Sequence, residues 1–149
     1  MCLAAVYYGM AYVSLEEDLF RVDAETPVLL GSRCAACGRS FFPRRRRCAV
    51  CLTPTEETDL SGEGVLHTHT YVRVPFFGKR QVEATAGYGV GQVDLPEGVR
   101  IQTVLRGEPG DWHIGMPMSI DLEVIDEDDG DEVVIFRFTP ALTEETTRA

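Results

Sequence analysis

Residues 34–51 read CAACGRSFFPRRRRCAVC, and the cysteines of this stretch decide the fold. They form two Cys-x2-Cys pairs separated by ten residues, Cys34 with Cys37 and Cys48 with Cys51. Each tight turn can hold two thiolates about one tetrahedron edge apart, so two turns complete a closed four-sulfur site. A closed site leaves no position for water or substrate. The spacing therefore predicts one zinc ion with a structural role rather than a catalytic one.

The remaining cysteine, Cys2, lies in an apolar opening segment, MCLAAVYYGMAYV. This segment has no basic leader, is too short to span a bilayer and is followed by acidic residues, so we do not interpret it as a signal peptide or a membrane anchor. Paired cysteines without a secretory leader favour metal binding over disulfides. We expect a cytoplasmic protein that does not bind membranes.

The net charge of −10 is distributed unevenly along the 149 residues. Residues 31–55 contain six arginines and no acid, which leaves −16 for the rest of the chain. The six are Arg33, Arg39, Arg44, Arg45, Arg46 and Arg47. The part of the chain outside residues 31–55 is acidic enough to repel a polyanion over most of its surface, which argues against extended nucleic-acid binding. Two interpretations of Arg44 to Arg47 stay open: a solvated face that offsets the metal site, or a patch that binds a phosphate group or a partner.

The remaining pattern predicts a mainly β protein. Ser14 and Glu17 have the form of a capping box before residues with near-helical spacing, so we expect a short helix over residues 14–22. Residues 39–43 predict a brief strand between the two cysteine turns, which completes the outline of a zinc ribbon. Further strands are expected at residues 64–74, 86–95, 99–105, 118–125 and 132–138.

Five strands are enough for a small barrel. Glycines at 62–64 and 87–91 supply the sharp bends that closure requires, so we predict an OB-fold barrel. The expected organisation is a leader and helix over residues 1–30, a zinc ribbon over 31–60, the barrel over 61–142 and a frayed tail over 143–149.

A second candidate contact site is the loop sequence PFFGKR at residues 75–80. Adjacent aromatic residues cannot both point easily into one core, so the loop either packs on the barrel or presents a ring to a ligand or partner. The candidate contact residues are Arg44, Arg45, Phe76, Phe77, Lys79 and Arg80.

The sequence offers no group of residues that predicts catalysis. His67, His69 and Tyr71 alternate along one expected strand without a neighbouring cysteine or acid, so we interpret them as a polar strand face. The acidic run at residues 126–132 fails the EF-hand pattern because Ile125 and Phe136 stand at ligand positions, and it predicts a charged hairpin turn. We therefore assign no catalytic residue.

Several stretches resemble, in order, the zinc-ribbon OB-fold proteins associated with acyl-CoA enzymes. They are LGSRCAACG (30–38), FPR (42–44), LSGEG (60–64), VDLPEGVR (93–100) and IGMPM (114–118). The resemblance implies a non-catalytic subunit or domain that works beside thiolase-like enzymes, including steroid side-chain aldolases, or beside acyl-CoA hydratases, and helps to form the acyl-CoA site. The chain differs from the family pattern at Ala49, where proline is common, and at Leu52, where glycine is more frequent. Neither difference removes a zinc ligand.

The sequence thus predicts an accessory subunit that docks, as part of a hetero-oligomer, on a thiolase-like, aldolase or other lyase partner. It would share the acyl-CoA substrate with that partner, with steroid or lipid side-chain degradation as one setting. An alternative is a nucleic-acid-binding OB-fold module with a zinc ribbon, because both parts occur in such proteins. A self-sufficient enzyme is a third hypothesis, which no residue pattern supports.

Overall fold

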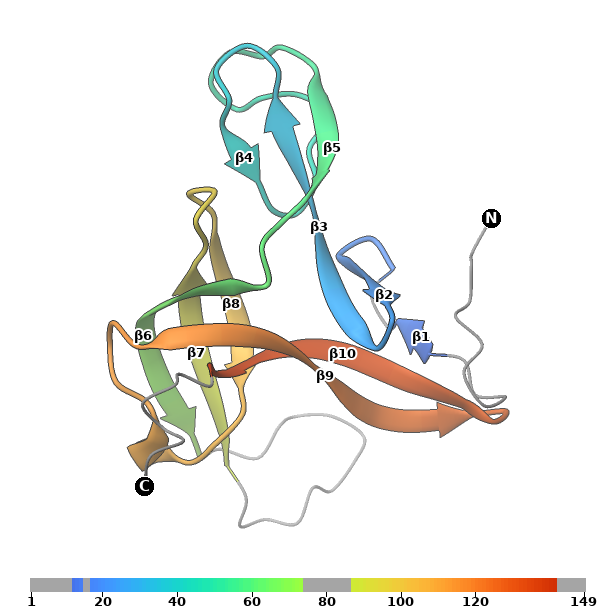
Figure 1. Ribbon diagram of the computed structural model, residues 1–149, viewed down its shortest axis with the longest axis vertical. Coiled ribbons are helices and arrows are strands. Elements are labelled where there is room, and N and C mark those ends of the chain that lie inside the picture. The colour runs from blue at the N-terminus through green and yellow to red at the C-terminus, as the bar shows by residue number, and fades with distance from the viewer. Residues whose placement is uncertain (1–11, 15–16, 74–86, 142–149) are drawn as a thin grey trace.

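The computed structural model describes residues 12–14, 17–73 and 87–141, and these residues form strands and turns (Figure 1). The described part contains no α-helix, and its single 3-10 turn covers Pro109–Asp111. The described residues contain no helix that is long and apolar enough to cross a membrane. The expectation of a mainly β protein is confirmed.

Five strands close into a barrel in the second half of the chain. They are β6 (Glu63–Val72), β7 (Tyr88–Asp94), β8 (Arg100–Leu105), β9 (Pro117–Asp128) and β10 (Asp131–Pro140). Strand β6 pairs with β7 and β9, β7 with β8, and β10 with both β8 and β9, so the circuit is complete. The pairing of β8 with β10 is parallel and short, with Leu105 opposite Phe138, whereas the other pairings are antiparallel. This is the predicted five-stranded OB-fold barrel.

Alternating side chains of these strands fill the barrel. In β7 and β8 every second residue is buried, which is the period of a strand with one face toward a core. The fully buried side chains of the barrel include Leu66, Val93, Ile101, Met118 and Phe138. Removing such side chains from water is the main favourable contribution to folding.

The turns that join the barrel strands follow the predicted chemistry. Gly98 has φ +82° in the turn after β7, where the amide of Leu95 donates to the carbonyl of Val99 (2.8 Å). The acidic turn after β9 places Asp129 and Gly130 at φ +50° and +86°, the positive values that a two-residue type I′ turn needs. The charged hairpin is therefore confirmed.

The expected helix over residues 14–22 is wrong. Ser14 ends β1 (Tyr12–Ser14), residues 17–19 form a turn, and the chain then enters β2 (Phe20–Asp23). Phe20 is 1% exposed and lies opposite Leu29, and burial along β2 alternates with the period of a strand. Pairing with β3 (Thr26–Cys34) therefore overrides the capping-box pattern.

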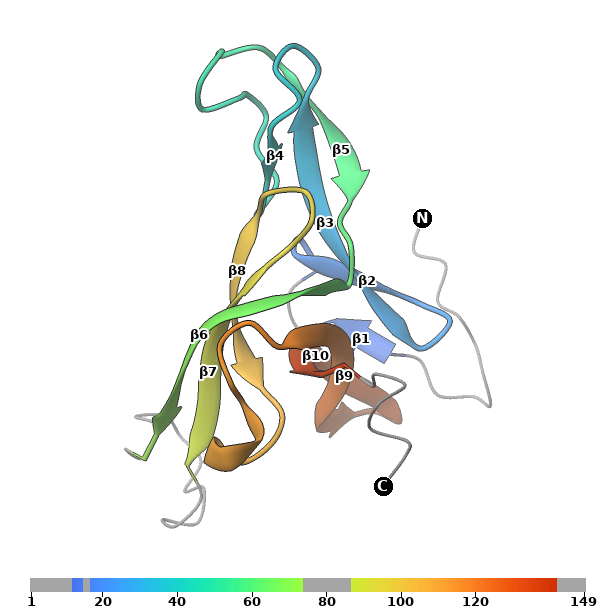
Figure 2. The same cartoon turned by 60° about the vertical axis from the view of Figure 1, so that its left-hand side comes forward.

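Strand β3 runs from its hairpin with β2 into the zinc ribbon. Its first half pairs with β2, and its second half pairs with β4 (Ser40–Phe41) and β5 (Thr55–Asp59). The ribbon therefore extends the sheet of β2 and β3 and projects away from the barrel (Figures 1 and 2). Strand β4 lies within the brief strand predicted at residues 39–43.

The junction between ribbon and barrel is closely packed. A Cβ atom at Gly31 would lie 2.7 Å from Cγ of Leu60, a buried side chain at the end of β5, so glycine allows β3 and this leucine to meet. Arg21 reaches across to Asp59 with two hydrogen bonds of 2.6 Å. These bonds hold the pKa of the Asp59 carboxyl below its usual range.

Gly89 leaves room for a core side chain, a role that differs from the bending predicted for the barrel glycines. A Cβ atom there would lie 2.3 Å from Cη2 of the buried Trp112 ring. We expect Gly89→Ala to lower the free energy of unfolding by about 1–3 kcal/mol, the usual cost of overpacking a core. Gly110→Ala is the matched control, because a Cβ atom there meets nothing within 4 Å. Urea denaturation measures both, and equal stabilities of the two variants would contradict the packing argument.

Candidate metal centre

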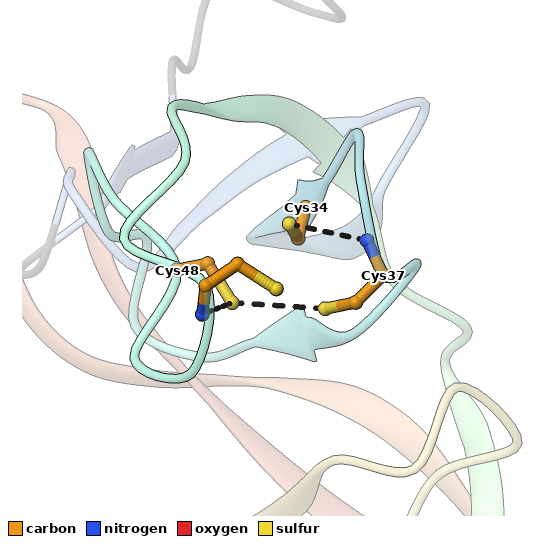
Figure 3. A group of neighbouring side chains, drawn as sticks. Cys34, Cys37 and Cys48 are labelled. Atoms are coloured by element: carbon orange, nitrogen blue, oxygen red, sulfur yellow. Dashed lines mark hydrogen bonds between the residues drawn. The ribbon is translucent and has the colours of Figure 1, made fainter.

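The folded ribbon brings the four cysteines of residues 34–51 together. Their Sγ atoms all lie within 4.8 Å of one another, and the Sγ atoms of Cys37 and Cys48 are 3.7 Å apart (Figure 3). A zinc ion with Zn–S bonds of about 2.3 Å in a tetrahedron sets its sulfurs about 3.8 Å apart. The donor set therefore fits Zn²⁺.

The first cysteine pair lies in a tight turn held by backbone hydrogen bonds. The amide of Cys34 donates to the carbonyl of Arg39 (2.8 Å), and the amide of Gly38 donates to the carbonyl of Cys34 (3.0 Å). The amide of Cys37 points at Sγ of Cys34 (3.5 Å). Gly38 has φ +74°, a left-handed conformation that the turn requires and that glycine adopts readily.

The second pair repeats the hydrogen bonds of this turn and adds one, from the amide of Val50 to Sγ of Cys48 (3.4 Å). The amide of Cys48 donates to the carbonyl of Thr53 (2.9 Å), and the amide of Leu52 donates to the carbonyl of Cys48 (3.1 Å). The amide of Cys51 points at Sγ of Cys48 (3.4 Å). Leu52 occupies the place of Gly38 and has φ +60°. The two cysteine turns are thus the same structure with a different residue at the left-handed position.

The amides directed at sulfur favour thiolates. The backbone hydrogen bond from Cys51 lowers the pKa of Cys48 to about 7. The hydrogen bond to Cys37 raises the pKa of Cys51 to about 12, because neighbouring sulfurs oppose a further negative charge. A bound dication removes that opposition and deprotonates its thiol ligands.

The site is closed because the protein supplies all four ligands. Cys34 and Cys48 are each 1% exposed and lie inside the ribbon, whereas Cys37 and Cys51 lie at its surface. Four sulfurs saturate tetrahedral zinc and leave no coordination position for a reacting molecule. The arrangement can hold a fold together, but it cannot activate water.

The arginines after the first turn surround a surface cavity of about 510 Å³. Its lining includes Arg44, Arg45 and Arg46 together with Ser32, which is buried. Arg44 is paired with Glu57 (2.9 Å) and lies 3.7 Å from a carboxylate oxygen of Asp18. The pairing of Arg44 with two acids was not predicted, because those acids are distant in sequence.

Arg45 is held differently from Arg44. Its guanidinium lies over the ring of Phe41, 5.6 Å from the centroid, and its amide donates to Oγ of Ser32 (2.9 Å). The structure therefore brings Arg44 and Arg45 to one cavity. The other candidate contacts, Phe76, Phe77, Lys79 and Arg80, lie outside the described residues.

The histidines of β6 have partners that the sequence did not reveal. Nδ1 of His67 lies 3.5 Å from Asp94, which Arg100 also binds with a 2.6 Å hydrogen bond. That bond holds the pKa of the Asp94 carboxyl below its usual range. His69 and Tyr71 pack against Trp112. The acid beside His67 comes from β7 and could only be found from the pairing of the strands.

The metal site generates a direct test. We expect Cys34→Ser and Cys48→Ser to reduce zinc from about one ion per chain to a small fraction of it and to unfold the ribbon, because metal-binding energy at such a site is folding energy. Cys2→Ser is the control and should retain zinc. Elemental analysis and thermal melting measure the two effects. Full zinc retention by Cys48→Ser would contradict the ligand assignment.

Comparison with protein families divides the chain into the same two parts. Residues 21–57 match the family model described as "ChsH2, rubredoxin-like zinc ribbon domain". Residues 57–123 match the one described as "ChsH2, C-terminal OB-fold domain". The zinc ribbon match and the four converging cysteines together confirm the predicted structural zinc.

Two relatives are similar in sequence over most of this chain. A "DUF35 domain-containing scaffold protein" from Methanocaldococcus jannaschii is 34% identical over 113 residues, which cover 74% of this chain and 78% of that protein. The "Benzoylsuccinyl-CoA thiolase subunit BbsA" from Thauera aromatica is 30% identical over 118 residues, 78% of each chain.

A solved structure is similar in both sequence and fold. A chain of the "Ltp2-ChsH2(DUF35) aldolase" has a TM-score of 0.59 and 27% identity, with 77% of this chain and 86% of that chain covered. The resemblance to zinc-ribbon OB-fold proteins, first seen in the sequence, is thereby confirmed. From its ribbon, its barrel and these matches, the chain belongs to the ChsH2-type DUF35 family of zinc-ribbon OB-fold proteins.

Proposed function

We propose that this protein is a non-catalytic accessory subunit that docks on a thiolase-like or aldolase enzyme and supports the binding of its acyl-CoA substrate. The closed metal centre carries the proposal. Its four ligand positions are all occupied by cysteine sulfur, so zinc stabilises the ribbon and takes no part in chemistry. A rigid ribbon on a small barrel is suited to contact another protein.

The relatives support a role beside an enzyme. One is named as a scaffold protein, one as a subunit of a thiolase that acts on a CoA ester, and one belongs to an aldolase with a second component. We extend this association to the present chain. Acyl-CoA esters of steroid or lipid side chains are the substrate class that we propose to test first.

The cavity beside the ribbon is our candidate for the CoA phosphates. Arginine binds phosphate through a planar fork of donors, and three arginines line this cavity. Glu57 already neutralises Arg44, so we assign the contact to Arg45 and Arg46, which form no ion pair with the described residues. Phe76, Phe77, Lys79 and Arg80 stay predicted contacts for the partner or the acyl chain.

Docking is tested with the thiolase-like or aldolase protein encoded beside this chain. We expect the two purified proteins to elute together in size-exclusion chromatography and the enzyme to gain activity on acyl-CoA in the complex. The zinc-free Cys48→Ser variant should bind poorly, because its ribbon is unfolded. Separate elution together with unchanged enzyme activity would show that the proposed function is wrong.

The arginine assignment is tested by single substitutions. We expect Arg45→Ala and Arg46→Ala to weaken CoA binding to the complex about tenfold each, because a charge-assisted hydrogen bond is worth roughly 1.5–3 kcal/mol. Arg44→Ala is the matched control and should have a smaller effect. Calorimetry measures CoA affinity, and elemental analysis measures zinc. If the arginines only offset the thiolates, zinc affinity will fall and CoA affinity will not.

A further inference from the structure

The second cysteine turn presents two large apolar side chains to solvent. Val50 is 60% exposed and Leu52 is 68% exposed, although both lie within two residues of a zinc ligand. Ala49, between Cys48 and Val50, is exposed as well. We call Ala49, Val50 and Leu52 the knuckle tip. An exposed apolar group on a rigid turn commonly marks an interaction site.

Leu52 has an unfavourable backbone conformation. Its φ of +60° lies in the left-handed region, which residues other than glycine, asparagine and aspartate rarely adopt. The matching position of the first turn is Gly38, with φ +74°. Its amide donates to the carbonyl of the first cysteine of the turn, Cys34, as the amide of Leu52 donates to that of Cys48. The fold therefore needs the left-handed conformation here, but it does not need a leucine side chain.

The leucine side chain contributes little to the stability of the fold. At 68% exposure it buries little apolar area, and it is absent from the hydrophobic core. Leu52 forms its hydrogen bonds through the main chain: the amide donates to the carbonyl of Cys48, and the carbonyl accepts from Nη1 of Arg47 (3.0 Å). Glycine would make the same two bonds. Among the described residues, no packing contact therefore accounts for a leucine at this position.

The charge around the knuckle tip indicates what would cover it. Residues 31–55 carry six arginines and no acid. Zinc with four thiolates contributes −2 and Glu57 neutralises Arg44, so the segment retains +3 and the arginines exceed what the metal site needs. A complementary surface is apolar at its centre and rimmed by carboxylates. A second copy of this chain is disfavoured at long range, because each copy has a net charge of −10.

We propose that the knuckle tip is the surface through which this chain docks on its enzyme partner, in an apolar pocket of that enzyme ringed by acidic side chains. This inference rests on the proposed function and adds the contact surface to it. The zinc site holds the tip in one conformation before docking, which lowers the entropy lost on association. Val50 and Leu52 supply the apolar contact, and Arg47 supplies a charge at the rim.

The test separates a docking role from a structural one by the direction of two effects. We expect Leu52→Gly to keep zinc and to melt at or above the wild-type temperature, because it relieves the left-handed conformation. The same variant should bind the neighbouring thiolase-like or aldolase enzyme at least tenfold more weakly, as expected when an anchor is lost. Val50→Ser should also weaken binding, and Arg47→Glu should slow association most strongly at low salt.

Ile114→Ser is the matched control, because Ile114 is also 68% exposed but lies in the loop before β9. It should bind as the wild type does. Unchanged affinity of Leu52→Gly in a complex that the wild type forms overturns this inference and leaves the proposed function standing. A lower melting temperature for Leu52→Gly, or a wild-type dimer that this change dissociates, overturns it too. If the wild type forms no complex, both proposals fail.

Discussion

The zinc–thiolate cluster is the interaction on which the first half of the molecule depends. Between residues 35 and 59, Cys48 is the only buried residue, so this part of the ribbon has almost no hydrophobic core. In a segment this small, apolar burial cannot offset the conformational entropy that is lost on folding. Four metal–sulfur bonds replace the missing core. We therefore expect the ribbon to be stable only as a metal complex, whereas the barrel is stabilised by packed side chains.

Strand β3 connects the zinc site to the rest of the fold. Its last residue, Cys34, is a zinc ligand, and its earlier residues pair with β2. Gly31 and Leu60 meet where the chain leaves the ribbon, and the bond between Arg21 and Asp59 closes the same junction. The orientation of the ribbon is therefore set by a continuous strand with packed contacts and not by a flexible linker.

The sequence predicted those features whose cause is local. Cysteine spacing predicted the metal site, and period-two alternation with turn residues predicted all five barrel strands and the acidic hairpin. It did not predict β1, β2, β3 or β5. Strands β2 and β3 form a local hairpin whose turn has Ala24 and Glu25, rather than glycine or asparagine, at positive φ. Strands β1 and β5 are defined by pairing with distant residues. The ion pair of Arg44 with Glu57 and the approach of His67 to Asp94 are long-range for the same reason. The division of the chain at residues 31 and 61 stays a prediction. Strand β3 is continuous across the first of these positions.

The seam between β8 and β10 has a consequence for the order of folding. The hairpins formed by β6 with β7, β7 with β8, and β9 with β10 join segments that are close in sequence, so each can form early. The seam joins Leu105 to Phe138 through one register pair, reinforced by the amide of Arg106 donating to the carbonyl of Phe138 (2.9 Å). It must wait until a loop of more than thirty residues has closed. The pairing of β6 with β9 spans still more of the chain, with Gly64 opposite Met118. We infer that these two long-range pairings form after the hairpins, so that their amide protons exchange before those of the hairpins.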